Sequence, residues 1–193
     1  MVEITTRPAT MREWEDVQAA LSGGGDGRSC QCAWPVLPNA EWSTSTIPQR
    51  RDLLRNEIRL GPPPGIVAYV DGSPAGWVRV GPRPAQRRMT RSKVVAASPE
   101  PLEDPTVWAI TCFSVRKEYR RLGLTARLLD AAVVYARENG ARVVEAYPID
   151  TTASKPSANA LFVGALSTFL SAGFTMRGHP TPSRATVSLA LRR

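Results

Sequence analysis

A basic pair, a glycine and the start of an aliphatic helix follow each other closely in the stretch EYRRLGLTARLLD, residues 118–130. The first turn of a helix presents backbone N–H groups without an intrahelical acceptor, together with a partial positive charge, so it can bind phosphate. Gly123 has no Cβ that would keep an anion away from these groups. Arg120 and Arg121 add charge and forked hydrogen-bond donors at the same end. The spacing therefore indicates a pyrophosphate site, with a plain strand-to-helix turn as the alternative.

Known nucleotide-binding loops do not explain this stretch. The chain contains neither G-x-x-x-x-G-K-[ST] nor a G-x-G-x-x-G that follows a strand. The GGGDG sequence at residues 23–27 lacks the lysine and the hydroxyl of a phosphate loop, so we interpret it as a flexible connection.

The spacing of apolar residues predicts the elements that must position the glycine turn. We expect strands at residues 2–7, 65–70, 73–80, 106–115, 141–149 and 185–192, and helices at residues 11–23, 46–60, 157–172 and from the turn to about 139. Because no repeat and no internal linker is visible, the sequence predicts one domain over residues 1–193, of the α/β or mixed α+β class.

Local signals support these boundaries. Thr10, with Glu13 three residues later, predicts a capping box, and Asp71-Gly72 predicts a hairpin turn. Residues 81–105 are basic and rich in proline, and we expect an irregular, mobile loop there. The apolar side of the helix at 46–60 is expected to hold Leu53, Leu54, Ile58 and Leu60. The helix at 157–172 should be capped by Ser157 and carry a stripe of Phe162, Ala165, Leu166, Phe169 and Leu170.

The composition is ordinary for a soluble globular protein, with 42% hydrophobic and 22% charged residues. No apolar run is long enough to span a membrane, and the first residues have no signal-peptide core. Three cysteines leave one unpaired in any disulfide scheme, so we expect a reduced, cytoplasmic chain. The net charge of +8 favours a polyanionic partner, but the chain has no recognised nucleic-acid-binding motif, which argues against nucleic acid.

The segment FSVRKEYRRLGLTARLLD, residues 113–130, resembles motif A of the GNAT superfamily, the acetyl-CoA-dependent N-acetyltransferases. That motif is a strand, then [QR]-x-x-G-x-[GA], then a helix. Arg120 and Gly123 match it, whereas Thr125 stands where glycine or alanine is usual. The order of expected elements is similar over nearly the whole chain. The resemblance implies a mixed, partly parallel sheet of six or seven strands with about four helices, whose fourth and fifth strands splay to open a cleft.

The resemblance also implies a co-substrate and a reaction. Acetyl-CoA would bind with its pantetheine arm on the backbone of Phe113, Ser114 and Val115. Its pyrophosphate would bind at Arg120 and at the amides of Arg121, Leu122, Gly123, Leu124 and Thr125. The acetyl group would pass to a primary amine of a small molecule or peptide by direct attack, without a metal or an acyl-enzyme. A module that binds acyl-CoA without catalysis is the alternative, and the oligomeric state, a homodimer included, stays open.

The residues that would move protons depart from the family pattern. Many members carry a tyrosine that protonates the departing thiolate, within N-x-x-A-x-x-x-Y-x-x-x-G-F. Aligned on Gly173-Phe174, this chain keeps Ala165 but has Phe162 for the asparagine and Phe169 for the tyrosine. Tyr147 is the substitute candidate, with a packed tyrosine as its alternative, and Ser167, Thr168 and Ser171 are further hydroxyls. Glu145, in an otherwise apolar strand, is the candidate base, and pairing with an arginine is its alternative.

Further residues concern the acceptor and the cysteines. In the family the segment between the first two helices lines the acceptor site, so Trp34 and Trp42 would form an aromatic wall there, with core packing as the alternative. Cys30 and Cys32 lack the spacing of a metal site, and Cys112, in mid-strand, is expected in the core. His179, beside two prolines, is expected on a surface hairpin loop.

Overall fold

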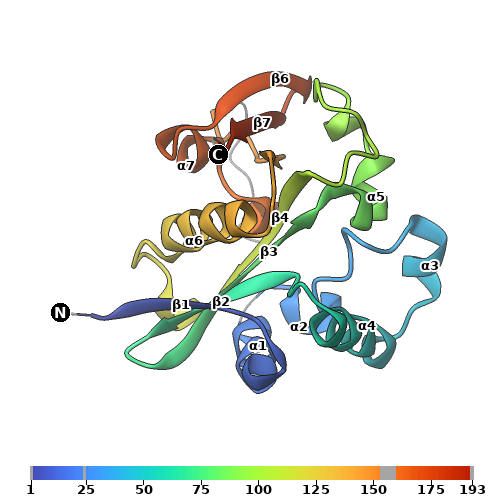
Figure 1. Ribbon diagram of the computed structural model, residues 1–193. Coiled ribbons are helices and arrows are strands. Elements are labelled where there is room, and N and C mark those ends of the chain that lie inside the picture. The colour runs from blue at the N-terminus through green and yellow to red at the C-terminus, as the bar shows by residue number, and fades with distance from the viewer. Residues whose placement is uncertain (1, 24, 153–159, 192–193) are drawn as a thin grey trace.

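A computed structural model describes residues 2–23, 25–152 and 160–191 of the chain. Its centre is a seven-stranded sheet in the order β1-β2-β3-β4-β5-β7-β6 (Figure 1). The strands are β1 (Ile4–Pro8), β2 (Gly65–Val70), β3 (Ser73–Pro82), β4 (Val107–Val115), β5 (Val143–Ala146), β6 (Thr175–Thr181) and β7 (Arg184–Ala190). β4 and β5 are parallel, and the other neighbouring pairs are antiparallel. The expected mixed sheet is therefore confirmed.

Seven α-helices surround this sheet in the described part of the chain. They are α1 (Trp14–Ser22), α2 (Gly27–Cys30), α3 (Asn39–Thr44), α4 (Ile47–Leu60), α5 (Arg87–Thr90), α6 (Leu124–Glu138) and α7 (Leu166–Ser171). Five 3₁₀ turns accompany them: η1 (Met11–Glu13), η2 (Arg83–Ala85), η3 (Lys93–Val95), η4 (Lys117–Tyr119) and η5 (Ala160–Val163). None of these described helices is long and apolar enough to cross a membrane.

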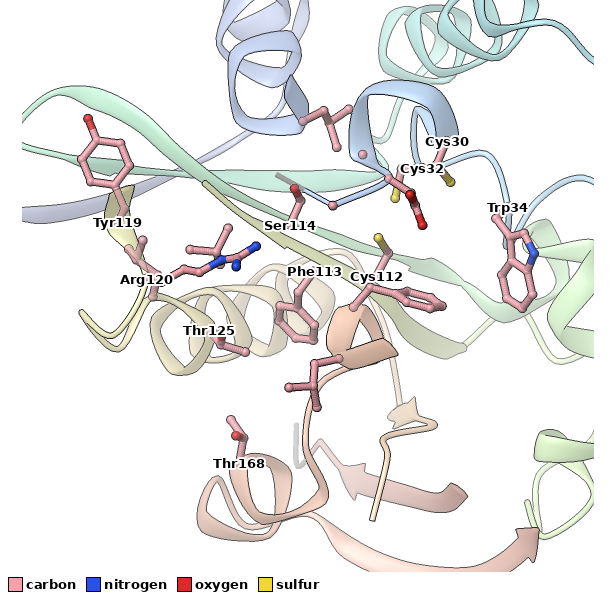
Figure 2. Close-up of a pocket in the computed structure, with 18 of the residues that line it drawn as sticks. Cys30, Cys32, Trp34, Cys112, Phe113, Ser114, Tyr119, Arg120, Thr125 and Thr168 are labelled. Atoms are coloured by element: carbon pink, nitrogen blue, oxygen red, sulfur yellow. The ribbon is translucent and has the colours of Figure 1, made fainter. Parts of the chain in front are cut away.

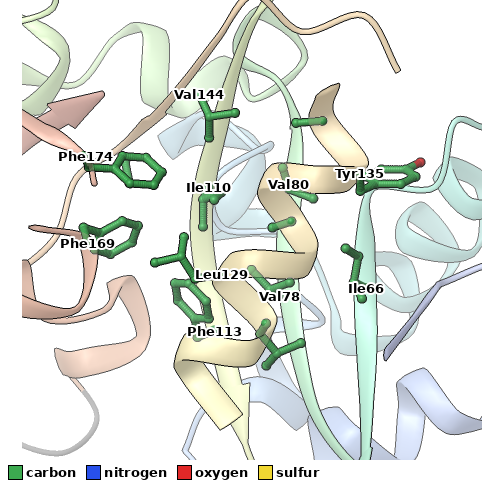
Figure 3. Close-up of a cluster of buried hydrophobic side chains, with 14 of the residues drawn as sticks. Ile66, Val78, Val80, Ile110, Phe113, Leu129, Tyr135, Val144, Phe169 and Phe174 are labelled. Carbon is green, nitrogen blue, oxygen red and sulfur yellow. The ribbon is translucent and has the colours of Figure 1, made fainter. Parts of the chain in front are cut away.

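The two faces of the sheet carry separate apolar clusters. Ile66 and Val70 of β2 pack into the larger cluster with α6, which Figure 3 shows lying across β2, β3 and β4. The alternate residues Val67 and Tyr69 join the cluster formed with α1 and α4. This period-two alternation is what a strand buried on both faces requires. The helix that begins at the glycine turn is thus held firmly against the sheet.

Several local expectations are confirmed. Thr10 and Glu13 form the capping box, although the first turn is the 3₁₀ turn η1 and α1 follows it. Asp71 and Gly72 join β2 to β3 with φ values of 46° and 78°, as a tight hairpin turn requires. Gly140 lies just after α6 with a φ of 83°, so the helix ends near residue 139, as expected.

Other expectations are wrong. Residues 81–105 are not simply an irregular loop, because they contain η2, α5 and η3, and Arg83 is fully buried. The helix expected at 157–172 is split into η5 and α7 by Gly164, whose φ is 83°, and Ser157 lies outside the described residues. Leu60 is 74% exposed instead of packed. His179 lies within β6 and not in a hairpin loop.

The splay between β4 and β5 follows from a short pairing and a bulge. β5 pairs with β4 only from Val107 to Ile110. On the other side of β4, the register with β3 shifts so that Thr111 is the extra residue between two paired positions. Bulges bend a strand and often occur beside active sites. From Thr111 to Val115 the edge of β4 that faces away from β3 is therefore free of β5.

Candidate active site

A cavity of about 800 Å³ runs along this free edge of β4 (Figure 2). It extends from the N-terminal end of α6 to the chain segment around α2 and Trp34. The lining includes nearly all of the residues expected to bind cofactor or acceptor, namely Trp34, Trp42, Phe113, Ser114, Val115, Arg120, Arg121, Gly123, Leu124 and Thr125. Leu122 does not line it, and this residue is 41% exposed.

One end of the cavity is the N-terminus of α6. Gly123 is the residue before the helix, with φ 76° and ψ 11°, and no side chain caps the helix there. The first intrahelical hydrogen bond runs from the Arg127 N–H to the Gly123 carbonyl at 3.2 Å, so the amides before Arg127 have no acceptor within the helix. A Cβ at Gly123 would meet no protein atom within 4 Å and would project into open space. This end therefore suits an anion that approaches the backbone closely.

Charge is concentrated at the same end. The Arg120 side chain is exposed, and Figure 2 shows its guanidinium directed into the cavity above Thr125. Arg121 also lines the cavity and, like Gly123, has a left-handed backbone with φ 68°. The space beside Gly123 is open, so an anion can reach the backbone there. Two successive cations and a helix N-terminus at this place fit the pyrophosphate of coenzyme A.

The middle of the cavity is the free edge of β4. Within residues 2–23, 25–152 and 160–191, the strand pairing of Phe113, Ser114 and Val115 is with β3 alone. An unpaired strand edge presents N–H and C=O groups that another extended chain can bind. A pantetheine arm, which carries two amide groups, would find matching partners there.

The other end is aromatic. Trp34 and the 37%-exposed Phe162 make an edge-to-face contact with ring centroids 6.1 Å apart. The guanidinium of Arg50 lies 3.6 Å from the ring centroid of Trp42, and that of Arg88 lies 4.6 Å from Trp34. These stacked cations fix the indole rings, although neither arginine lines the cavity. The tryptophans thus form a wall of the cavity, and their contact with an acceptor stays a prediction.

Several lining residues were not predicted as site residues. They lie at the end of α1, in the segment from Gly25 to Cys32, in β4, in η4, in α6, in η5 and in α7, and they are Leu21, Gly25, Asp26, Gly27, Ser29, Cys30, Cys32, Cys112, Tyr119, Ala126, Leu161, Phe162 and Thr168. Asp26 is the only carboxylate among the described lining residues. The two aspects of the sequence that could have drawn attention to this segment are its closely spaced cysteines and its position between two helices.

The three cysteines are brought together at the cavity. Cys112 packs against the apolar cluster of α1 and α4, as expected of a core residue, but it is also partly exposed at the cavity. The Trp77 indole N–H donates to the Cys32 sulfur at 3.2 Å, and the Cys112 and Cys32 side chains hydrogen-bond each other. The buried Arg79 guanidinium donates to the Cys32 carbonyl at 3.2 Å.

These surroundings shift the pKa values of the thiols in opposite directions. Burial alone would raise the pKa of Cys32, but the hydrogen bond with Cys112, the Arg79 charge and the Trp77 N–H together lower it. The hydrogen bond with Cys32, together with burial, raises the pKa of Cys112 well above its usual value. Burial, helped by Cys32, raises the pKa of Cys30 to about 11. The Cys32–Cys112 pair therefore favours a thiolate, whereas Cys30 stays a thiol.

The backbone at Cys32 is strained. Gln31 and Cys32 are consecutive non-glycine residues with φ values of 50° and 53°. Such left-handed conformations cost about 1–3 kcal/mol each and persist where the surroundings enforce them. Here the Gln31 side chain bonds Gln18 and the Arg28 carbonyl, each at 2.9 Å. At this turn the Cys32 sulfur accepts the hydrogen bond of the Trp77 indole.

Tyr147 and Glu145 lie outside the cavity. Tyr147 is 1% exposed, and its hydroxyl donates to Glu145 at 2.9 Å. Glu145 is fully buried, bonds Ser98 and accepts from Arg83 at 2.7 Å. The structure contains the alternative noted for Glu145, an ion pair with an arginine. It also contains the alternative noted for Tyr147, a packed tyrosine.

The position of the usual family tyrosine is also closed. Phe169 is fully buried and packs edge-to-face against Phe113 and Phe174, with centroids 6.1 and 5.3 Å away. Its neighbour Thr168 lines the cavity instead. Of the three hydroxyl residues considered on this helix, Thr168 is the one that reaches the site.

The fold and cavity together define an acyl-transferring protein of the acetyltransferase class, and comparison with known families agrees. The model of the acetyltransferase (GNAT) family matches residues 31–164, so the chain belongs to this family. A comparison with curated protein sequences gives no match.

Solved structures share the fold across the whole chain. An N-acetyltransferase from Staphylococcus aureus Mu50 has a TM-score of 0.58 at 19% identity, covering 98% of this chain and 99% of its own. A ribosomal-protein-alanine N-acetyltransferase from Brucella melitensis has a TM-score of 0.56 at 18% identity, covering 97% and 99%. PaiA N-acetyltransferase from Thermoplasma acidophilum, in complex with coenzyme A, has a TM-score of 0.56 at 13% identity, covering 98% and 99%.

Proposed function

We propose that residues 1–193 form one acetyltransferase domain that moves the acetyl group of acetyl-CoA to a primary amine by direct attack. The observation that carries the proposal is the continuity of the cavity. It joins the open helix N-terminus at Gly123, the free edge of β4 and the tryptophan wall. Phosphate, an extended amide chain and an amine-bearing acceptor would meet these three parts in that order.

The lining residues would each bind or position one part of the substrates. Arg120 and the amides from Arg121 to Thr125 hold the pyrophosphate, and the β4 edge from Phe113 to Val115 orients the pantetheine arm. Acetyl-CoA supplies the thioester. Fixing the amine against that thioester provides much of the acceleration, because the amine is itself the nucleophile. Sheet and helix residues thereby act mainly by positioning.

Asp26 is our candidate for the group that attracts the acceptor's ammonium and accepts its proton. It lines the cavity beside α2, and it is the only carboxylate among the described residues that do so. A general base must reach the proton that it removes, and Glu145 is enclosed by Arg83, Ser98 and Tyr147. Trp34 and Trp42 would contact the rest of the acceptor.

A screen of amine classes with acetyl-CoA, following released CoA thiol, tests the proposal. Small-molecule amines and peptide N-termini should be included, since neighbours in fold act on both kinds: one is an agmatine N-acetyltransferase and another a ribosomal-protein-alanine N-acetyltransferase. Asp26→Asn should lower kcat with acetyl-CoA affinity kept, and Asp52→Asn, on α4 outside the cavity, is the matched control. Binding of acetyl-CoA without transfer to any amine would favour the non-catalytic alternative.

A further inference from the structure

Two thiols of the cavity have no part in acetyl transfer to an amine. Cys32 and Cys112 hydrogen-bond each other and both line the cavity, while Cys30 lines it nearby (Figure 2). Figure 2 shows the sulfur atoms of Cys32 and Cys112 facing one another between Phe113 and Trp34. A simple packing role would not need a strained backbone at Cys32 or an opening to a cavity.

The place of this pair relative to the β4 edge indicates what it would meet. Cys112 directly precedes Phe113, where the edge proposed for the pantetheine arm begins, and it follows the bulge at Thr111. With the pyrophosphate at Gly123, the arm would run toward Cys112 and bring its terminal sulfur there. The group nearest the two thiols would thus be the sulfur of coenzyme A.

The charges and donors around Cys32 and Cys112 suit the attack of a thiolate on another sulfur atom. The Trp77 N–H at 3.2 Å and the buried Arg79 guanidinium stabilise negative charge on the pair. Glu57 forms an ion pair with Arg79. The thiolate is the form of cysteine that attacks disulfides, and a second thiol within reach can resolve the mixed disulfide.

We propose that Cys112 and Cys32 carry out thiol–disulfide exchange with disulfides of coenzyme A bound in this cavity. The proposal rests on the proposed function only in that the same cradle would hold coenzyme A. Cys112 is partly exposed and makes the attack, whereas Cys32 is 1% exposed and serves first as the acceptor of the Cys112 proton.

The exchange balances in two steps. Cys32 starts as the thiolate of the pair and takes the Cys112 proton as the Cys112 sulfur attacks one sulfur of the CoA disulfide. The S–S bond breaks, a CoA thiolate leaves and takes up the proton, and Cys112 holds a mixed disulfide with CoA. Cys32, again a thiolate, then attacks Cys112; the second CoA leaves as a thiolate and takes a proton from solvent, and a Cys32–Cys112 disulfide remains. The two cysteines are oxidised, and the CoA disulfide is reduced to two thiols.

The test uses the fully reduced chain, with the symmetric CoA disulfide as probe and glutathione disulfide as comparison. Released thiol, intact mass and peptide mapping are measured after acid quenching. The wild type should release two CoA thiols, lose two hydrogens and yield a Cys32–Cys112 peptide. The site proposed for the pyrophosphate at Gly123 would bind CoA but not glutathione, which has no pyrophosphate. The reaction with the CoA disulfide should therefore be at least about tenfold faster than with glutathione disulfide.

Single variants resolve the order of steps. Cys32→Ser lacks the group that takes the Cys112 proton, so it should react more slowly, stop after the first step and retain one covalent CoA on Cys112. Cys112→Ser should retain none, and Cys30→Ser should behave as the wild type. Equal rates with the two disulfides, a mapped disulfide that includes Cys30, or an adduct in Cys112→Ser would each overturn the proposal. Calorimetry with CoA separates the two levels. Reduced protein that binds no CoA refutes the proposed function, and protein that binds CoA but leaves the disulfide intact refutes this inference alone.

Discussion

The segment from β4 into α6 and the end of β5 were both expected to hold functional residues, yet the structure places them differently. The first opens along a cavity, with an unpaired strand edge and a helix N-terminus that no side chain caps. At the second, Glu145 and Tyr147 are buried and bonded to each other and to Arg83. Backbone groups left without partners are available to a ligand, whereas a carboxylate bonded on all sides by its own chain is not.

The comparison shows that burial and polarity alone do not mark a site. An isolated carboxylate in an apolar strand needs partners, and they can come from a distant loop as readily as from a substrate. Arg83 is such a partner, reaching Glu145 from η2 and also bonding the Glu100 and Pro101 carbonyls. The end of β5 thus fastens the 81–105 segment to the sheet.

Breaking this buried pair should have the largest effect. Glu145→Gln removes one charge and leaves the fully buried Arg83 without an ionic partner. Loss of one member of a buried ion pair costs about 3–5 kcal/mol, so urea unfolding should show a decrease of that size. The control is Glu41→Gln, since the side chains of the Glu41–Arg87 pair are 48% and 49% exposed. An exposed pair contributes about 0–1 kcal/mol. Equal losses for both variants would mean that the Glu145 site is not sealed.

Gly123→Val tests the open segment. The valine Cβ would enter the space proposed for the pyrophosphate, and acetyl-CoA affinity should fall roughly 10²-fold or more, about 2.7 kcal/mol. Gly140→Val is a matched control, because Gly140 has a φ of 83° against 76° at Gly123 and also faces open space. Both variants should lose about 1–3 kcal/mol of stability through left-handed strain. Calorimetry should show weakened binding only for Gly123→Val, and unchanged affinity would remove the pyrophosphate assignment.

Arg120→Ala should have a smaller effect at the same end. Its exposed guanidinium contributes a charge-assisted contact in solvent, so affinity for acetyl-CoA should fall about tenfold and depend less on salt. Arg127→Ala removes the same charge from an exposed position of α6 outside the cavity, and should leave affinity nearly unchanged. If the two variants weaken binding equally, general positive charge and not a placed contact attracts the cofactor.

What the sequence could predict follows from how local each feature is. Arg120, Gly123 and the start of α6 lie in one short stretch, so residue types and spacing sufficed to place them. The same holds for the capping box at Thr10 and the Asp71-Gly72 turn. These features depend on backbone geometry that neighbouring residues determine.

The acceptor end could not be predicted in this way because distant segments assemble it. Cys32 meets Cys112 across 80 positions of sequence, and Trp34 meets Phe162 across 128. The glycines around Asp26 indicated a flexible connection, yet α2 forms there and lines the cavity. Likewise, nothing near Arg83 in the sequence indicates that its side chain would be buried in an ion pair with Glu145.

Tyr147→Phe gives the smallest expected effect and separates the two interpretations of the β5 end. Removing the hydroxyl deletes one hydrogen bond to Glu145, which keeps its bond to Arg83, so stability should fall by about 1 kcal/mol. Burial, with the Glu145 charge, raises the pKa of Tyr147 well above its usual value. A raised folded pKa contributes stability that is present below the unfolded value of about 10 and is lost as the pH rises above it. The stability advantage of the wild type over the variant should therefore shrink above about pH 10.

With the best acceptor found by the amine screen, kcat and acetyl-CoA affinity should be unchanged in Tyr147→Phe, since the hydroxyl faces Glu145 and not the cavity. A fall in kcat of roughly 10²-fold with affinity kept would instead identify Tyr147 as the proton donor and require the β5 end to open during turnover.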